Sequence, residues 1–165
     1  MKLKELVLNK RVSESQCSEL TDKTVFINRV AKVVKGGRRF SFSALIVTGD
    51  GLGHVGIGLG KAGEVPDAIK KGADAARASL VKVPIKGSTI PHDIIGEFSS
   101  TKIVMKPAGP GTGVIAGSVC RALAESAGIK DIRMKCIGSN NPQNILKAAL
   151  NGFLSLQDPE QLAAL

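Results

Sequence analysis

The chain has 165 residues, of which 43% are hydrophobic, and it carries a formal net charge of +9 at pH 7. This composition predicts a folded, basic protein of one domain or two small ones, and no apolar run approaches the ~20 residues that a membrane-spanning helix needs. The three cysteines are odd in number and include no CxxC pair, which argues against a disulfide framework or zinc site and predicts reduced thiols in a cytoplasm.

Residues 1–23 are predicted to form a flexible polar lead. They lack a sustained apolar stretch and contain four acidic residues, which argues against a secretion signal or an organellar transit peptide. We therefore expect regular structure to begin near Thr24.

Residues 24–49 are predicted to form a β-hairpin with a basic tip. Apolar residues alternate with polar ones on both sides of Gly36-Gly37, and glycine can supply the positive φ angles of a tight turn. The segment contains no Asp or Glu and five basic residues, which are Arg29, Lys32, Lys35, Arg38 and Arg39. Like charges this close repel one another, and contact with phosphates relieves the repulsion while releasing counterions. The hairpin therefore predicts contact with a nucleic acid.

The aromatic content indicates which kind of nucleic acid. The chain has no Trp or Tyr and five Phe, and we assign Phe40 and Phe42, on one strand face, to the core. A platform for stacking unpaired bases is therefore not expected, and recognition of folded, double-stranded RNA through its backbone and shape is favoured. Asn28 could add a hydrogen bond to a base edge or a 2′-hydroxyl.

A glycine-rich strand and a helix are predicted to complete the first unit. The strand covers residues 54–59, and its glycines suggest that another element approaches closely. Pro66, beside two acids, signals a helix start. Gly58-x-Gly60-x-x-Gly63 matches the dinucleotide-binding pattern, but Glu64 and Asp67 would repel a pyrophosphate at that helix end. We expect a β-β-β-α domain over residues 24–86.

A second unit is predicted over residues 87–153, with a tail at residues 154–165. Strands at 90–98, 102–106 and 129–137 and helices at 114–127 and 142–153 give the order β-β-α-β-α, so the fold class is α+β. The glycine-rich turn at 109–113 precedes a helix without acids in its first turn. Three interpretations remain open: a tight connection, a phosphate site assisted by Lys106, or a partner surface.

No catalytic set of residues is apparent, and we expect no enzymatic activity and no cofactor. His54 is expected to be a surface or RNA-facing residue and His92 a structural or solvated one. Two alternatives are kept. A small phosphotransfer enzyme would use the loop at 107–113, although we find no acid near it to hold Mg²⁺ and no general base. A free regulator of messenger RNA would bind short duplexes.

Four motifs resemble the family of bacterial small-subunit ribosomal protein number five, in the family's order and over residues 24–153. The first two are Asn28 to Phe42 of the hairpin and the stretch from Gly49 to Pro66, which includes Gly60-Lys61-Ala62. The others are Gly111-Thr112-Gly113-Val114-Ile115-Ala116-Gly117 and Gly138-Ser139-Asn140-Asn141-Pro142. His54 departs from the pattern, since the family often has Arg or Lys there.

The resemblance implies a double-stranded-RNA-binding-like domain followed by the family's βαβ-type domain. It implies a structural, cytoplasmic protein that binds 16S ribosomal RNA, lines the messenger entry channel and contacts small-subunit proteins four and eight. The contact with protein four would bear on decoding accuracy. The residues expected to contact RNA are Asn28, Arg29, Lys32, Lys35, Gly36, Gly37, Arg38, Arg39 and Lys61. The residues expected to contact phosphate or a partner are Lys106, Thr112, Gly113 and Arg121.

Overall fold

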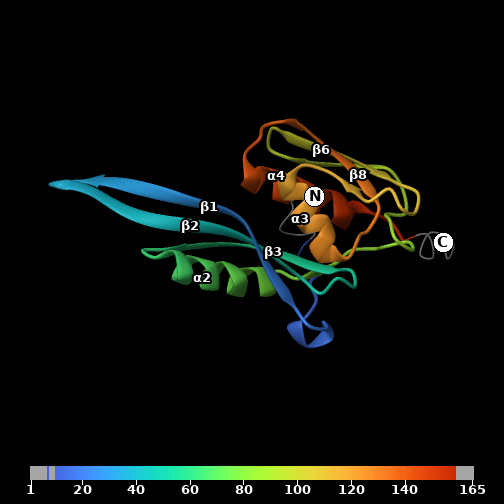
Figure 1. The fold of residues 1–165 in the computed structure, drawn as a ribbon, viewed down its shortest axis with the longest axis horizontal. Coiled ribbons are helices and arrows are strands. Elements are labelled where there is room, and N and C mark those ends of the chain that lie inside the picture. The colour runs from blue at the N-terminus through green and yellow to red at the C-terminus, as the bar shows by residue number, and fades with distance from the viewer. Residues whose placement is uncertain (1–6, 8–9, 159–165) are drawn as a thin grey trace.

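The computed structural model describes residue 7 and residues 10–158, which form two stacked four-stranded sheets with helices beside and between them (Figure 1). In the first sheet the order is β1-β2-β3-β4, and all neighbouring strands are antiparallel. Its strands are β1 (Thr21–Val34), β2 (Gly37–Gly49), β3 (His54–Ala62) and β4 (Val81–Lys82). Helix α2 (Val65–Arg77) covers one face. The predicted β-β-β-α order is confirmed, and β4 adds a short edge strand.

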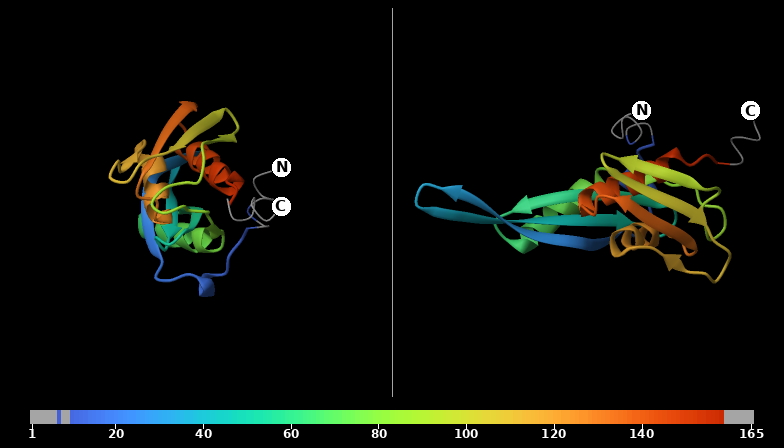
Figure 2. Two further views of the ribbon diagram at one scale, coloured as in Figure 1. Left: turned by 90° about the vertical axis from the view of Figure 1, so that its right-hand side faces the viewer. Right: turned by 90° about the horizontal axis from the view of Figure 1, so that it is seen from above.

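The second sheet has the order β5-β6-β8-β7, and β7 is parallel to β8. Its strands are β5 (Ile94–Phe98), β6 (Thr101–Pro107), β7 (Val114–Ile115) and β8 (Ile132–Gly138). Helices α3 (Ser118–Ala127) and α4 (Pro142–Ser155) lie between the two sheets (Figures 1 and 2). The α+β class is therefore confirmed.

The predicted helix at 114–127 is wrong over its first four residues. Val114 and Ile115 form β7 and pair with Ile132 and Arg133 of β8, and helix α3 begins only at Ser118. The β-branched side chains at 114 and 115 suit a strand, and a strand partner distant in the sequence completes the pairing. The predicted end of this helix is confirmed, because Gly128 has a φ of 86° and forms a left-handed C-cap.

Parts of the predicted lead and tail belong to the folded body. Strand β1 begins at Thr21, three residues before the expected start, and the 3₁₀ turn η1 (Glu14–Gln16) precedes it. The backbone N–H of Val12 donates to the carbonyl of Leu80 at 2.9 Å. Helix α4 extends to Ser155. The lead at 1–6 and 8–9 and the tail from 159 onward lie outside the described residues.

The glycines of β3 let helix α2 approach the sheet closely. A side-chain carbon added at Gly56, Gly58 or Gly60 would collide with the backbone of α2. Gly72 of the helix faces the sheet, where it lies against Ile46. The predicted close approach is confirmed, and the glycines that resemble a dinucleotide motif are explained by packing.

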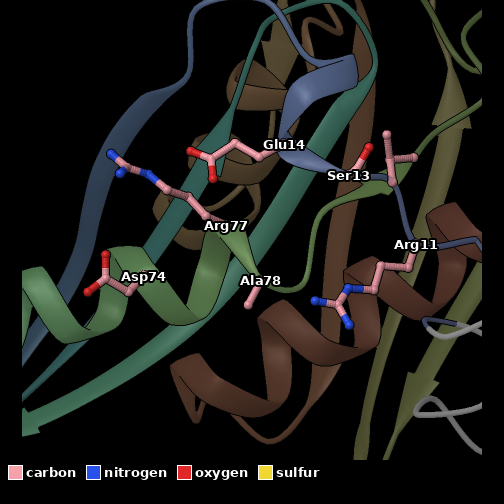
Figure 3. A pocket seen from close by; sticks show the side chains of 7 residues that line it. Arg11, Ser13, Glu14, Asp74, Arg77 and Ala78 are labelled. Atoms are coloured by element: carbon pink, nitrogen blue, oxygen red, sulfur yellow. The ribbon is translucent and has the colours of Figure 1, made fainter.

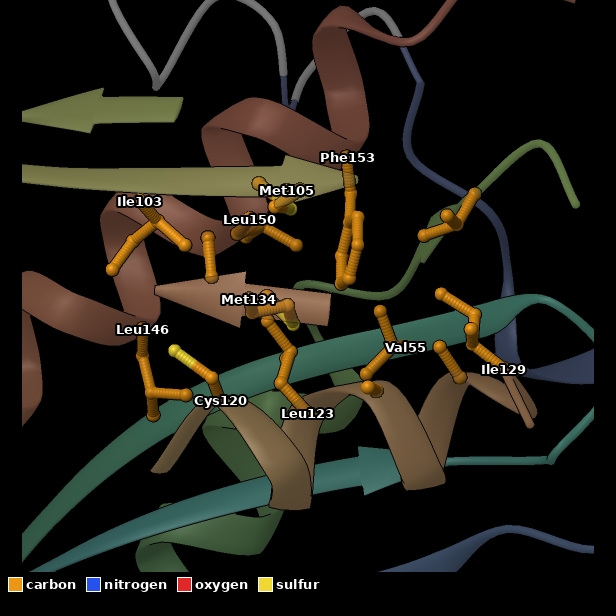
Figure 4. Packing of buried hydrophobic residues seen from close by; sticks show 14 of the residues in the cluster. Val55, Ile103, Met105, Cys120, Leu123, Ile129, Met134, Leu146, Leu150 and Phe153 are labelled. Atoms are coloured by element: carbon orange, nitrogen blue, oxygen red, sulfur yellow. The ribbon is translucent and has the colours of Figure 1, made fainter. Parts of the chain in front are cut away.

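The other face of the first sheet packs against α3, so that both units share one hydrophobic core (Figure 4). Val55 of β3, Leu123 of α3 and Phe153 of α4 are fully buried in this cluster. Because the cluster is continuous, the base of the β1–β2 hairpin has a fixed orientation relative to the second sheet.

Candidate nucleic-acid interface

The β1–β2 hairpin extends as a long arm beyond the body of the molecule (Figures 1 and 2). Val34 pairs with Gly37, so the loop contains only Lys35 and Gly36. Gly36 and Gly37 have φ angles of 100° and 149°, as predicted for the turn. All residues from 26 to 40 are exposed. The arm therefore presents both of its faces, and its tip, to a binding partner.

The five basic residues are distributed over both faces of the arm and its tip. Lys32 pairs with Arg39, and Val33 pairs with Arg38. Because neighbouring strand residues point to opposite faces, Lys32 and Arg39 share one face and Arg38 lies on the other, together with Arg29. Lys35 occupies the tip. An arm charged on both sides suits insertion between phosphate backbones better than docking on a flat surface.

The charges of the arm are not neutralised within the protein. Among residues 10–158, no carboxylate forms an ion pair with any of the five basic side chains. Arg29 is held locally, since its guanidinium carbon lies 3.9 Å from the centroid of the Phe40 ring. Phe40 is 49% exposed, so its assignment to the core is wrong; the arm at that point lies beyond the packed body. Phe42, by contrast, packs against a small cluster under α2.

A groove of about 400 Å³ lies on the same face of the sheet as Lys32 and Arg39, between the base of the arm and the second unit. Its lining residues are Phe26, Asn28, Val30, Ser43, Leu45, Leu59, Lys61, Asn141, Pro142 and Gln143. Asn28 and Lys61 lie on either side of Ser43, because both pair with it across the sheet. The structure thus brings together Asn28, Lys32, Arg39 and Lys61 on one face.

The far side of the groove is the N-terminus of α4, which we did not predict as part of the interface. Asn141 is the N-cap and its side chain accepts the N–H of Gln143 at 3.1 Å. The first turn contains no acidic residue, so the helix end adds partial positive charge beside Lys61. The motif Gly138 to Pro142 signals this helix start, but the sequence does not show that it faces the hairpin.

The loop at 109–113 has a different environment from the one expected for a phosphate site. The side chain of Asp131, which is 4% exposed, lies against it and accepts the N–H of Gly113 at 2.8 Å. The Ser88 hydroxyl and the loop N–H groups, that of Gly113 foremost, lower the pKa of this carboxyl. The expectation that no acid lies near this loop is therefore wrong. The loop amides are directed at a protein carboxylate, which removes the physical reason for placing a phosphate here.

The four residues expected at this second site are only partly brought together. Thr112 donates its hydroxyl to the carbonyl of Gly109 at 2.7 Å, which closes the turn. Arg121 is exposed on α3. Lys106 lies opposite Arg133 on the outer face of the second sheet, and among the described residues no recorded hydrogen bond or ion pair joins it to the loop. A partner contact at Gly113 and Arg121 stays a prediction.

Comparison with known proteins agrees with the arrangement of the two sheets. Residues 20–84 match the family Ribosomal protein S5, N-terminal domain, and residues 96–165 match Ribosomal protein S5, C-terminal domain. The chain belongs to the ribosomal protein S5 family. A relative from Syntrophobacter fumaroxidans, named Small ribosomal subunit protein uS5, is 55% identical over 152 residues, which cover 92% of each chain. A relative of the same name from Chloroflexus aurantiacus is 54% identical over 146 residues, covering 88% of this chain and 82% of its own.

A hollow elsewhere on this S5-family chain is lined mostly by charged side chains (Figure 3). It measures about 630 Å³, and its lining includes the charged residues Arg11, Glu14, Asp74 and Arg77. Arg77 pairs with Asp22 at 2.8 Å. The Ser13 hydroxyl, which also lines the hollow, lies 3.1 Å from that of Ser15.

The two histidines have structural partners. His54, with a side chain 17% exposed, bonds through Nδ1 to Asp50 at 2.7 Å, which contradicts the expected surface or RNA-facing position. His92 accepts the N–H of Gln157 at 3.2 Å through Nε2, as expected for a structural residue. Among the described residues, no helix is both long and apolar enough to cross a membrane.

Proposed function

We propose that this chain is a structural, RNA-binding constituent of the small ribosomal subunit and has no enzymatic activity. The observation that carries the proposal is the β1–β2 arm, whose five basic side chains lack a carboxylate partner among residues 10–158. The membership in the ribosomal protein S5 family supports it. In this proposal the arm enters 16S ribosomal RNA, and phosphates neutralise both of its faces.

The groove beside the arm gives this contact a second point of attachment. Lys61 and the α4 N-terminus provide positive charge, while Asn28 and Gln143 offer groups that can hydrogen-bond to sugar or base atoms. A-form RNA displays its 2′-hydroxyls in a wide, shallow groove, which a protruding arm and an adjoining polar surface can follow together.

The finer proposals concern the location of the protein in a cytoplasmic ribosome and its neighbours there. We place the side of the protein that carries the β1–β2 arm near the messenger entry channel. We assign the half-buried Gly113 and the exposed Arg121 to a contact with small-subunit protein four, which would connect this chain to decoding accuracy. We assign a further contact to protein eight. What supports these assignments is the motif match at 111–117 and the exposure of Arg121 and of the neighbouring loop residues.

The direct test is fractionation of the full chain on sucrose gradients with small subunits. We expect it to co-sediment with them at low salt and to leave them only in concentrated salt. A chain that stays at the top of the gradient at low salt would contradict the proposal. An ATP-turnover assay separates the phosphotransfer alternative, which predicts hydrolysis that is lost when Thr112 is replaced by Ala.

A further inference from the structure

Three side chains that can bind metals meet at one end of the first sheet, far along the chain from one another. Cys17 follows η1, whereas Asp50 lies in the connection between β2 and β3, and His54 is the first residue of β3. One ligand atom from each lies within 4.8 Å of those of the other two. The thiol, imidazole and carboxylate are three ligand types that zinc accepts in proteins.

The carboxylate of this cluster is held in one orientation. The Asp50 side chain is 1% exposed, and its Oδ1 accepts the N–H groups of Leu52 at 2.8 Å and His54 at 3.1 Å. Its Oδ2 is left to face Nδ1 of His54 at 2.7 Å. The connection itself is braced by α3, because Gly53 donates its N–H to the carbonyl of Ala127 at 2.9 Å.

The thiol of Cys17 is held close to this connection by the segment before β1. The segment is attached to the first sheet by the hydrogen bond from Val12 to Leu80 and by a bridge between Arg11 and Val81. The sulfur lies 3.8 Å from the carbonyl oxygen of Ser13, a contact that leaves it free to bind another atom. Two separately anchored segments therefore present their ligands to the same point.

We propose that Cys17, Asp50 and His54 bind one zinc ion, with water as the fourth ligand. Ligand atoms around tetrahedral zinc are about 3.3 to 3.8 Å apart, given bonds of about 2.0 to 2.3 Å. Because the ligand atoms lie within 4.8 Å of one another, binding requires the wider separations to shrink by at most about 1 Å, and the Asp50–His54 contact to open by somewhat less. Binding takes neutral imidazole, whose proton moves from Nδ1 to Nε2, and releases the thiol proton to solvent, so no oxidant or other co-reactant is needed.

The bound ion would connect the segment before β1 to the β2–β3 connection and so stabilise the folded state. The sequence argued against a zinc site because the cysteines lack CxxC spacing. That rule covers ligands that are close in the sequence, whereas these three are assembled by the fold.

The test uses the full chain, first freed of metal with a chelator and then titrated with Co²⁺ and Zn²⁺. We expect one Co²⁺ per chain, with the visible bands of tetrahedral cobalt and a thiolate charge-transfer band. Zn²⁺ should displace the cobalt and raise the melting temperature. Absence of the charge-transfer band in the wild-type chain would overturn the proposal.

Matched variants locate the ligands. Cys17→Ser should abolish the charge-transfer band and weaken zinc binding at least about 10- to 100-fold, the loss typical even of outer-shell partners. His54→Gln should weaken binding to a similar degree while retaining Cys17. Cys136→Ser removes a half-buried thiol outside the cluster and should bind zinc as the wild type does. Circular dichroism verifies that each variant is folded. Equal zinc affinity of Cys17→Ser and wild type, or loss of binding in Cys136→Ser, would show that the site is not here.

Discussion

Neutralising two residues at the tip of the arm, with Arg38→Gln and Arg39→Gln together, should reduce the salt dependence of RNA binding. The five basic residues of the arm lack carboxylate partners among residues 10–158, so each can hold one phosphate. Each phosphate contact contributes about 0.9 to the slope of log affinity against log salt, so the double variant should lose about 2 from that slope. Over a fourfold rise in salt, five contacts cost about 500-fold in affinity and the remaining three about 40-fold.

The assay is equilibrium binding to a 16S ribosomal RNA fragment at several salt concentrations. The matched control is Lys23→Gln with Lys102→Gln, which removes the same net charge from exposed residues. These two lysines already pair with Glu125 at 2.5 Å and with Glu97 at 2.9 Å. The control should therefore change the slope little. If both double variants shift the slope equally, overall charge and not the arm governs binding, and the reasoning is refuted.

Three further predictions concern the body of the protein. Gly58→Ala should destabilise the protein by about 1 to 3 kcal/mol in urea unfolding, because the added carbon collides with α2. The control Gly63→Ala, where the space is open, should leave the stability unchanged. Equal losses of stability in the two variants would contradict the packing argument. Gly113→Glu should lower the free energy of unfolding by about 1 to 2 kcal/mol, because Gly113 has a φ of 77° that glutamate adopts only with strain. Gly113→Asn should lower it by less, and equal losses would exclude backbone strain as the cause. Folding lowers the pKa of Asp131, so its ionised carboxylate stabilises the folded state above about pH 4, and this stabilisation is lost as the pH falls through the folded pKa. In Asp131→Asn, the free energy of unfolding should therefore fall less steeply as the pH is lowered.

The elements that the sequence predicted well are those specified by nearby residues. The hairpin follows from alternation around Gly36-Gly37, and the close packing of α2 follows from glycines in a strand. The basic charge of the arm could be identified because its charge bias requires no knowledge of the fold. In each case the physical cause lies within a few residues of its effect.

The features that were missed depend on residues distant in the sequence. The strand at Val114 forms because β8 pairs with it, and the anion position in the loop at 109–113 is taken by Asp131. Phe40 was assigned to the core because it alternates correctly, but the arm extends past the elements that would cover it. Local periodicity predicts the face of a strand and not whether another element packs on it.

Helix α3 should make the two sheets unfold together, and Leu123→Ala tests this. Leu123 is fully buried in the cluster that contains both Val55 of the first sheet and Met105 of the second. Removing its side chain should cost about 2 to 5 kcal/mol. Because one core serves both units, the loss should appear equally in the slowest-exchanging amides of β2 and β6, measured by native-state hydrogen exchange. A loss confined to one sheet would mean that the units unfold independently, and that the arm and the surface at Gly113 are not held in one fixed arrangement.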